Sequence, residues 1–553
     1  MKLCLLTVAL LAAAPGAFAQ PTAGGAQLQQ IPPAPTLPKA IPDIRIDRGQ
    51  RPSAPEAGGA RFVVRTLRVS GATRFTEAEL IAASGFQPGA ELDLAGLRSL
   101  AARITDLYAR HGYFVAQAYV PAQGIADGVV TIGVIEGQYG VIGLNNQSRA
   151  HDSVARGIMA GLKPGDLVAT APLERRLLLL SDLPGVVVKS TLAPGAAVGT
   201  SDLAVELLPG RIVTGEVEAD NAGNRYTGEY RAGGTINFNE PLGFGDMASL
   251  RVLSAGSGFN YARASYQFTV QDATLGVAYA HLSYRLGREF SPLHASGTVD
   301  IASLYGSYPL IRSRQTDLYA LADFDVRTFK DKVGSTASVT DKTARVATLG
   351  LAGDHRDSFM AGGWTTGSVN VSLGDLDIRT PQVRAIDAVT ARTQGSYSKV
   401  VFEAAHVTNL GGPWSVYGQA RGQIASKNLD SSEKMELGGA YGVRAYPEGE
   451  AYGDEGYILT AEARLRLARL SELTRGNLSA VAFADAGGIR INKSPWAPGT
   501  NSRTLSAAGV GLTWADNDNL MVKVSYAWKL GNEPATSAPD RSGRLWVQIT
   551  KFF

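Results

Sequence analysis

One arginine and one aspartate have the side chains and the setting for a specific interaction. Arg444 lies in a stretch rich in glycine and acidic residues, Tyr441–Tyr457, and Asp485 lies farther along in the segment Phe483–Gly487. A guanidinium binds a carboxylate in bidentate fashion, so the two residues could pin a loop to a wall. We take as one motif the pair and its neighbours: Val443, Arg444, Ala445, Tyr446, Phe483, Asp485 and Gly487.

The C-terminal region, from Arg211 to Phe553, would position this motif. It consists of alternating segments separated by Gly, Asp, Asn and Pro. The pattern marks an odd number of strands, but single-chain bacterial barrels have an even number, so we assign the glycine-interrupted segment Lys434–Gly442 to a loop. Residues 210–553 therefore predict a membrane β-barrel of 16 antiparallel strands around an aqueous lumen.

Strand alternation and strand order orient the two charged residues. Alternation places Val481, Phe483 and Asp485 on one face of a strand. An ionised aspartate facing lipid costs a few kcal/mol, so this face should point to the lumen. With both barrel ends in the periplasm, the loop that carries Arg444 is the sixth extracellular loop, long enough to reach Asp485.

The N-terminus predicts export from the cytoplasm. Lys2, the apolar run Leu3–Ala14 and the site Ala17-Phe18-Ala19 predict a signal peptide, residues 1–19. The single cysteine, Cys4, lies within it, so the mature chain would contain neither a disulfide nor a thiolate metal site. Residues 20–60 contain eight prolines and predict an extended periplasmic leader in which Gln27–Gln30 does not predict a stable helix.

Two small α+β units with the order βααββ are predicted between leader and barrel, at residues 61–137 and 138–209. Thr76 to Glu79 forms a capping box for one helix, and Asp93 is a good N-cap for the next. In the second unit, Val186–Thr191 is an exposed edge strand that could add an extended client strand by β-augmentation.

The segments Leu107–Tyr113, Ala118–Gln123 and Val134–Gly137 resemble polypeptide-transport-associated (POTRA) domains of the two-partner secretion type. The whole mature chain is similar to the two-partner secretion B (TpsB) family, the haemolysin and filamentous haemagglutinin exporters. The resemblance implies that residues 61–137 and 138–209 are POTRA 1 and POTRA 2, in the periplasm. It also implies an outer-membrane translocator that exports a dedicated, large, β-rich partner in type V secretion.

The resemblance further implies the partners and the sites. Partners would be a secreted TpsA-type passenger protein, outer-membrane lipids and, during biogenesis, the barrel-assembly machinery, but no nucleic acid. Cargo would bind POTRA edge strands, exemplified by Val186, Val187 and Val188. The loop motif in the family is Val-Arg-Gly-Tyr or Val-Arg-Gly-Phe, and this chain has Ala445 in place of the glycine. Because alanine tolerates positive φ poorly, the turn at the loop tip could differ from that of the family.

The last segment, Leu545–Phe553, predicts the closing strand. Leu545, Val547, Ile549 and Phe553 share one face, as expected of a lipid-facing strand. The terminal phenylalanine also resembles the signal by which barrels are recognised for insertion.

Other function classes have weaker support. The six histidines lack metal-ligand spacing, and the chain has no nucleophile elbow and no phosphate-binding glycine loop, so we predict no enzyme, cofactor or metal. A general diffusion porin would not need the two N-terminal units. A barrel-assembly insertase of the same superfamily stays an alternative, although a longer array of periplasmic domains would be expected for it.

Overall fold

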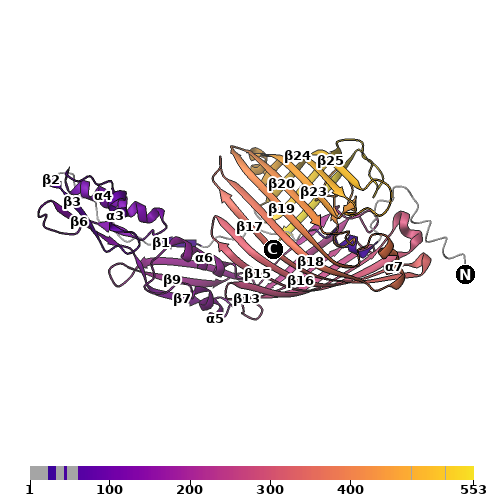
Figure 1. Ribbon diagram of the computed structural model, residues 1–553, viewed down its shortest axis with the longest axis horizontal. Helices are drawn as coiled ribbons and strands as arrows, with labels where there is room; N and C mark the ends of the chain where they lie inside the picture. Colours follow the sequence, from indigo (N-terminus) through magenta and orange to yellow (C-terminus); the bar gives the residue numbers. More distant parts are fainter. Residues whose placement is uncertain (1–22, 33–42, 47–59, 475, 517–518) are drawn as a thin grey trace.

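The computed structural model describes residues 23–32, 43–46, 60–474, 476–516 and 519–553. The predicted signal peptide, residues 1–19, and most of the predicted leader lie outside the described residues. Two α+β units are arranged in line at one end of a β-barrel (Figure 1).

The first unit has two helices packed on a small sheet. Its elements are β2 (Phe62–Val64), β3 (Thr66–Ser70), α3 (Glu77–Ser84), β4 (Ala90–Leu92), α4 (Leu94–Arg110), β5 (Gln117–Tyr119) and β6 (Val129–Ile135). The predicted caps form: Thr76 and Glu79 make the capping box of α3, and the Asp93 side chain accepts from the Gly96 N–H at 2.8 Å. The apolar stripe of α4, including Leu97, Ile104 and Tyr108, is buried against the sheet.

The second unit repeats the βααββ order. Its elements are β7 (Gln138–Asn146), α5 (Asp152–Met159), α6 (Thr170–Ser181), β8 (Val186–Pro194) and β9 (Thr200–Pro209). The sheet order is β1-β8-β9-β7, so a strand from the leader, β1 (Asp43–Ile46), adds to the unit in parallel with β8.

Ion pairs join the second unit to the near end of the barrel. Arg176 of α6 binds Asp272 at 2.7 Å, and Asp182, which directly follows α6, binds Arg312 at 2.8 Å. Because each partner lies at or beside a short turn between barrel strands, these contacts fix the unit at the mouth of the barrel.

The barrel is closed and antiparallel, which confirms the predicted architecture. Its strands are β10 (Val213–Asp220), β11 (Arg231–Asn239), β12 (Met247–Ser254), β13 (Phe259–Val270), β14 (Ala273–Arg285), β15 (Ala295–Arg312), β16 (Thr316–Val333), β17 (Ser338–Asp357), β18 (Gly363–Ile378), β19 (Gly395–Gly411), β20 (Trp414–Ala425), β23 (Glu455–Arg466), β24 (Gly476–Arg490), β25 (Ser502–Asp516), β26 (Leu520–Lys529) and β27 (Gly543–Phe552). The first and last strands close it, with Glu216 opposite Phe552.

The connections contain short elements only. These are η1 (Arg288–Leu293), η2 (Gly334–Thr336), α7 (Pro381–Val389), β21 (Met435–Glu436), β22 (Tyr452–Gly453) and α8 (Ala468–Thr474). β21 and β22 pair with each other outside the barrel ladder, as expected from assigning Lys434–Gly442 to a loop. Among the described helices, none has the length and apolar content needed to cross a bilayer.

The faces of the barrel strands follow the predicted alternation. Phe483 and Asp485 are buried on the inner side of β24, whereas Leu545, Ile549 and Phe553 are exposed on the outer face near the C-terminus. These apolar side chains therefore face outward, and Asp485 faces the lumen as predicted.

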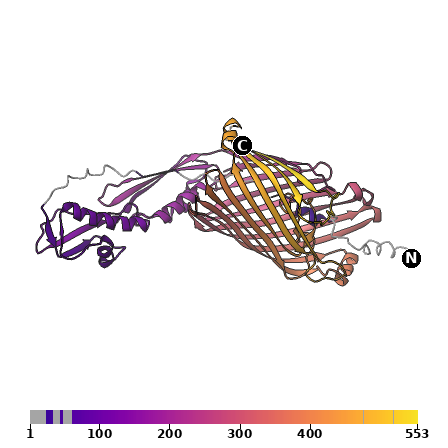
Figure 2. The same ribbon diagram turned by 90° about the horizontal axis from the view of Figure 1, so that it is seen from above.

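Two segments fill part of the lumen. One is the connection between β20 and β23, residues 426–454, which we call loop 6. The other is a short helix, α2 (Gly24–Leu28), which lies against β14, β15 and β16 inside the barrel (Figures 1 and 2). The sequence left open whether the leader forms a helix, and the structure contains one. Contacts with the barrel stabilise a helix that is too short to form alone.

Candidate functional site

Arg444 reaches the lumen wall at the tip of loop 6. Its Nε and NH2 donate to the two oxygens of Asp485, each at 2.8 Å, and its NH1 donates to Glu462 at 3.0 Å. Its backbone N–H also donates to Asp485, at 3.2 Å. The structure thus brings together the two residues that the sequence singled out, in the expected bidentate geometry.

The surroundings of this contact exclude water from one side. The Asp485 side chain is fully buried, and the Arg444 side chain is 14% exposed. The guanidinium carbon lies 3.4 Å from the centroid of the Phe483 ring, as in a cation–π contact. The hydroxyl of Thr460, on β23, donates to Asp485 at 3.0 Å. Because an unpaired charge here would be desolvated, each partner depends on the other.

The turn at the loop tip tolerates alanine. Ala445 is fully buried and is not among the residues with positive φ, so the alanine in the glycine position strains no backbone angle. The turn is closed by the Tyr446 N–H, which donates to the Val443 carbonyl at 3.0 Å, and the Trp546 indole donates to the Arg444 carbonyl at 2.7 Å. The departure from the family motif therefore leaves the tip intact.

Gly487 provides the close approach of the wall to loop 6. A Cβ at this position would lie 2.7 Å from a methyl carbon of Leu437, which is itself buried. The same Cβ would lie 2.8 Å from the carbonyl oxygen of Tyr457 on β23, so a side chain at residue 487 would crowd the neighbouring strand as well as loop 6.

The candidate cargo strand is partly occupied by the chain itself. β1 pairs with Lys189 to Leu192 of β8, whereas Val186–Val188 pair only with β9 among the described residues. Val186 and Val188 point into the core of the second unit, and Val187 is 47% exposed. Only the backbone edge and the Val187 side chain remain accessible there.

Sequence reasoning missed several residues that hold loop 6. Glu462 is the second partner of Arg444, and Trp546 fixes its carbonyl. Alternation could have found Glu462, because Thr460, Glu462 and Arg464 alternate with alanines on β23, as Asp485 does on β24. Other ion pairs join loop 6 to barrel strands: Asp430 to Lys342, Glu433 to Arg327 and Lys399, and Glu450 to Arg503. Lys434 and Asp454 pair with each other within loop 6.

The described residues contain no group of three or more His, Cys, Asp or Glu side chains that could hold a metal ion. The charged groups of the lumen are arranged in ion pairs that hold loop 6 against the barrel wall.

Comparison with known proteins identifies the family whose sequence model this chain matches. Residues 199–514 match the family model described as haemolysin secretion/activation protein ShlB/FhaC/HecB, and residues 62–137 match the ShlB-type POTRA domain. The chain is 28% identical over 472 residues to the heme/hemopexin transporter protein HuxB of Haemophilus influenzae, covering 84% of this chain and 82% of that protein. It is 23% identical to the outer membrane transporter CdiB of Dickeya dadantii, covering 87% and 85%.

Solved structures share the fold. CdiB from Escherichia coli superposes with a TM-score of 0.70 at 20% identity, covering 91% of this chain and 93% of that chain. BamA from Haemophilus ducreyi, lacking its POTRA domains 1–3, gives a TM-score of 0.53 at 14% identity, covering 89% and 100%.

Proposed function

Because the chain belongs to the ShlB/FhaC/HecB family, it is an outer-membrane transporter that exports a secreted partner protein by two-partner secretion, and we propose that loop 6 controls this export through Arg444 and Asp485. The observation that carries the proposal is the bidentate contact between these residues, buried against the Phe483 ring. This contact holds the tip of loop 6 on β24, so that the loop lies across part of the lumen. The wall beside it contains the charged residues Asp485 and Glu462.

The proposed partner is one dedicated, large, β-rich protein that passes the lumen as an extended chain and folds outside. Outer-membrane lipids surround the apolar belt, and the barrel-assembly machinery inserts the chain during biogenesis. The motif residues Val443, Ala445 and Tyr446 shape the tip, and Gly487 admits it to the wall. This mechanism transports a polypeptide and contains no catalytic step.

Arg444→Ala and Asp485→Ala test this role. Each should strongly reduce secretion of the partner, while the amount of protein in the outer membrane and its heat-modifiability stay near wild type, because the barrel ladder does not depend on one side-chain pair. Asp377→Ala is a matched control, since this aspartate is half exposed and faces outward. Wild-type secretion by Arg444→Ala would overturn the proposal.

We further propose that the partner binds the edge of β8 by exchange with β1. The edge already accepts one extended strand of this chain, Asp43–Ile46, which supports its ability to accept another. A cargo strand would extend along Val186–Val188 and replace β1.

A disulfide between positions 45 and 191, which are opposite each other in the β1–β8 register, tests the exchange. In Arg45→Cys/Thr191→Cys, oxidation should lock β1 in place and weaken binding of the partner's N-terminal segment, and reduction should restore it. Either single cysteine serves as a control. Equal binding by the oxidised and reduced forms would exclude exchange at this edge.

A general diffusion porin does not account for the two α+β units that are fastened to the barrel mouth. The likeness to BamA shows a shared fold. Deletion of residues 62–137 tests whether the first α+β unit serves export: the deletion should abolish export and leave a heat-modifiable barrel in the outer membrane.

A further inference from the structure

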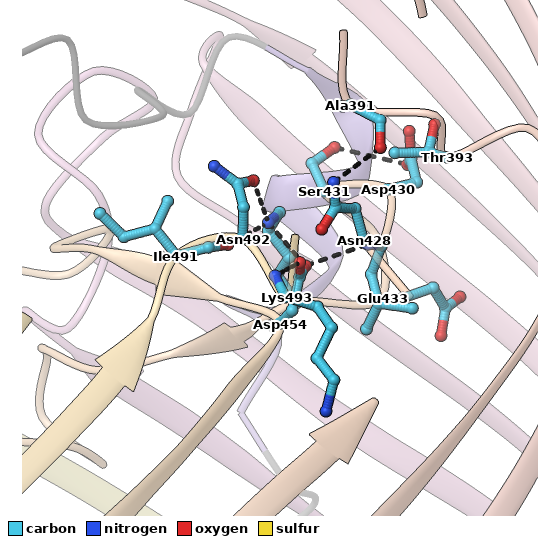
Figure 3. A network of polar contacts seen from close by, with 12 residues as sticks. Ala391, Thr393, Asn428, Asp430, Ser431, Glu433, Asp454, Ile491, Asn492 and Lys493 are labelled. Atoms are coloured by element: carbon cyan, nitrogen blue, oxygen red, sulfur yellow. Dashed lines mark hydrogen bonds and ion pairs between the residues drawn. The ribbon is translucent and has the colours of Figure 1, made fainter. Parts of the chain in front are cut away.

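The root of loop 6, where its two limbs leave β20 and β23, contains a second buried cluster. Asp454 at its centre has a fully buried side chain. One carboxylate oxygen accepts from the Leu429 N–H at 3.0 Å and from the Lys434 ammonium at 2.6 Å, and the other accepts from the Lys493 N–H at 2.7 Å (Figure 3).

These contacts join separate segments of the chain. Leu429 and Lys434 belong to the first limb of loop 6, Asp454 ends the second limb, and Lys493 lies in the connection between β24 and β25. The Lys434 ammonium also donates to the Ile491 carbonyl at 2.5 Å. Asp454 therefore fastens both limbs to each other and to the neighbouring connection.

Asn428 extends the cluster to a further connection. Its amide donates to the Ala391 carbonyl at 2.8 Å (Figure 3). The amide also donates to the Ser494 carbonyl at 2.9 Å, and the side-chain oxygen of Asn428 accepts from the Ser494 N–H at 2.7 Å. Ala391 lies between β18 and β19. The root is thus held from two sides by parts of the chain that do not belong to loop 6.

None of these hydrogen bonds involves Arg444, Asp485 or Glu462. Root and tip share no partner, so breaking one contact leaves the other in place. A carboxylate without solvent contact and with these donors cannot leave without depriving the Lys434 ammonium and two N–H groups of a buried partner, so the root is a costly attachment to open in its own right.

We propose that Asp454 is a positioning residue for export, which fixes the root so that loop 6 stays in the lumen when the Arg444 contact opens. The inference rests on the proposed function of the tip. It implies that the lumen widens by movement of the tip about a fixed root, and that loop 6 as a whole is not expelled.

Distances between spin labels test this in the full chain, reconstituted in lipid nanodiscs. One label is placed at Ala440→Cys in loop 6 and the other at Gly418→Cys on β20, where an added side chain meets open space. The labelled protein is compared with variants that also carry Arg444→Ala, Asp454→Ala or both, and with Asp377→Ala as a control.

Arg444→Ala should broaden the distance distribution around its original mean. Addition of Asp454→Ala should create a second population, displaced from the wild-type distance, and single-channel currents should fluctuate more. The proposal is overturned if Arg444→Ala alone gives the displaced population, or if Asp454→Ala adds nothing to it.

Lys434→Met is the alternative when Asp454→Ala does not insert. It removes the ammonium and leaves both N–H donors to Asp454, so it should give a smaller displaced population in the Arg444→Ala background. No displacement would again overturn the proposal. Because these readouts need no exported partner, they decide the role of Asp454 even where normal secretion by Arg444→Ala refutes the role of the tip.

Discussion

Loop 6 and α2 occupy the same lumen but are bound in different ways. Loop 6 is connected to the barrel at both ends and forms ion pairs with the wall through Asp430, Glu433, Arg444 and Glu450. The segment 24–31 around α2 contains no charged side chain.

The contacts of α2 are short hydrogen bonds and close packing. The Gly24 N–H donates to Asp331 at 2.9 Å, the Gln29 amide donates to the Ser432 carbonyl at 2.6 Å, and Arg231 donates to the Gln30 carbonyl at 2.7 Å. Such bonds contribute about 0.5 to 1.5 kcal/mol each, and somewhat more to a charged group.

The difference indicates which segment can leave. Breaking a buried ion pair strands a charge and costs about 3 to 5 kcal/mol. The α2 segment contributes only uncharged groups to its contacts, and water can replace these groups once the lumen is wet. We therefore expect α2 to be the removable occupant and loop 6 the retained one.

The largest effect should follow from Gly25→Val. A Cβ at Gly25 would lie 2.6 Å from the backbone nitrogen of Ser432, so a branched side chain should expel α2 from the lumen. Conductance in planar bilayers should rise several-fold. Gly418→Ala, on β20 where an added side chain meets open space, should leave conductance unchanged, and wild-type conductance of Gly25→Val would contradict the comparison.

Loss of the tip contact should be the next largest effect. Amide hydrogen exchange in residues 437–446 should be faster in Arg444→Ala, in Asp485→Ala and in the double mutant. In each variant the free energy of opening the loop tip should fall by about 3 to 5 kcal/mol. The double mutant should be no worse than either single, because all three remove one interaction. Additive changes would mean that the two residues act separately.

Removal of Phe553 should weaken the seam between the first and last barrel strands without affecting loop 6 or α2. The Phe553 N–H and carbonyl each bond to the backbone of Gly215, at 3.0 and 3.1 Å, so the truncated chain should close its seam less well. Its level in the outer membrane should fall, as measured by heat-modifiability, and the remaining fraction should keep wild-type conductance. An unchanged level would show that the terminal residue does not contribute to insertion.

The smallest effect concerns the junction between the second unit and the barrel. Burial, reinforced by neighbouring Asp246, raises the pKa of Glu240 to about 7, and the Arg149 guanidinium donates to the Glu240 carbonyl at 3.3 Å. Because the folded pKa lies above the unfolded value of 4.5, this carboxyl stabilises the fold at low pH and loses that contribution as pH rises from about 4.5 to 7.

The loss should be on the order of 2 kcal/mol, seen as a lower melting temperature at pH 8 than at pH 5. Glu240→Gln should remove this dependence while leaving conductance unchanged. Persistence of the full pH dependence in Glu240→Gln would assign it to other groups.

Local patterns were sufficient for the barrel and for the tip contact. Alternation in Val481–Asp485 fixes which side chains face the lumen, because a charged side chain in lipid is costly whatever its neighbours. Glycines in Lys434–Gly442 removed one false strand, and the remaining even number fixed which end of the barrel carries Arg444. The capping residues Thr76 and Asp93 likewise act within one turn of their own helix.

The tertiary structure alone decided what lies inside the barrel and on the edge of β8. Gly24–Leu28 is too short and too neutral to predict a helix, and it forms one because Tyr284, Val299 and Ser432 surround it. The pairing of β1 with β8 and the contacts of Asp454 join segments that no local pattern relates. The alternation along one strand depends only on whether each side chain faces lipid or water, so it can be read from the sequence of that strand. Contacts between distant segments exist only after the barrel has closed around them.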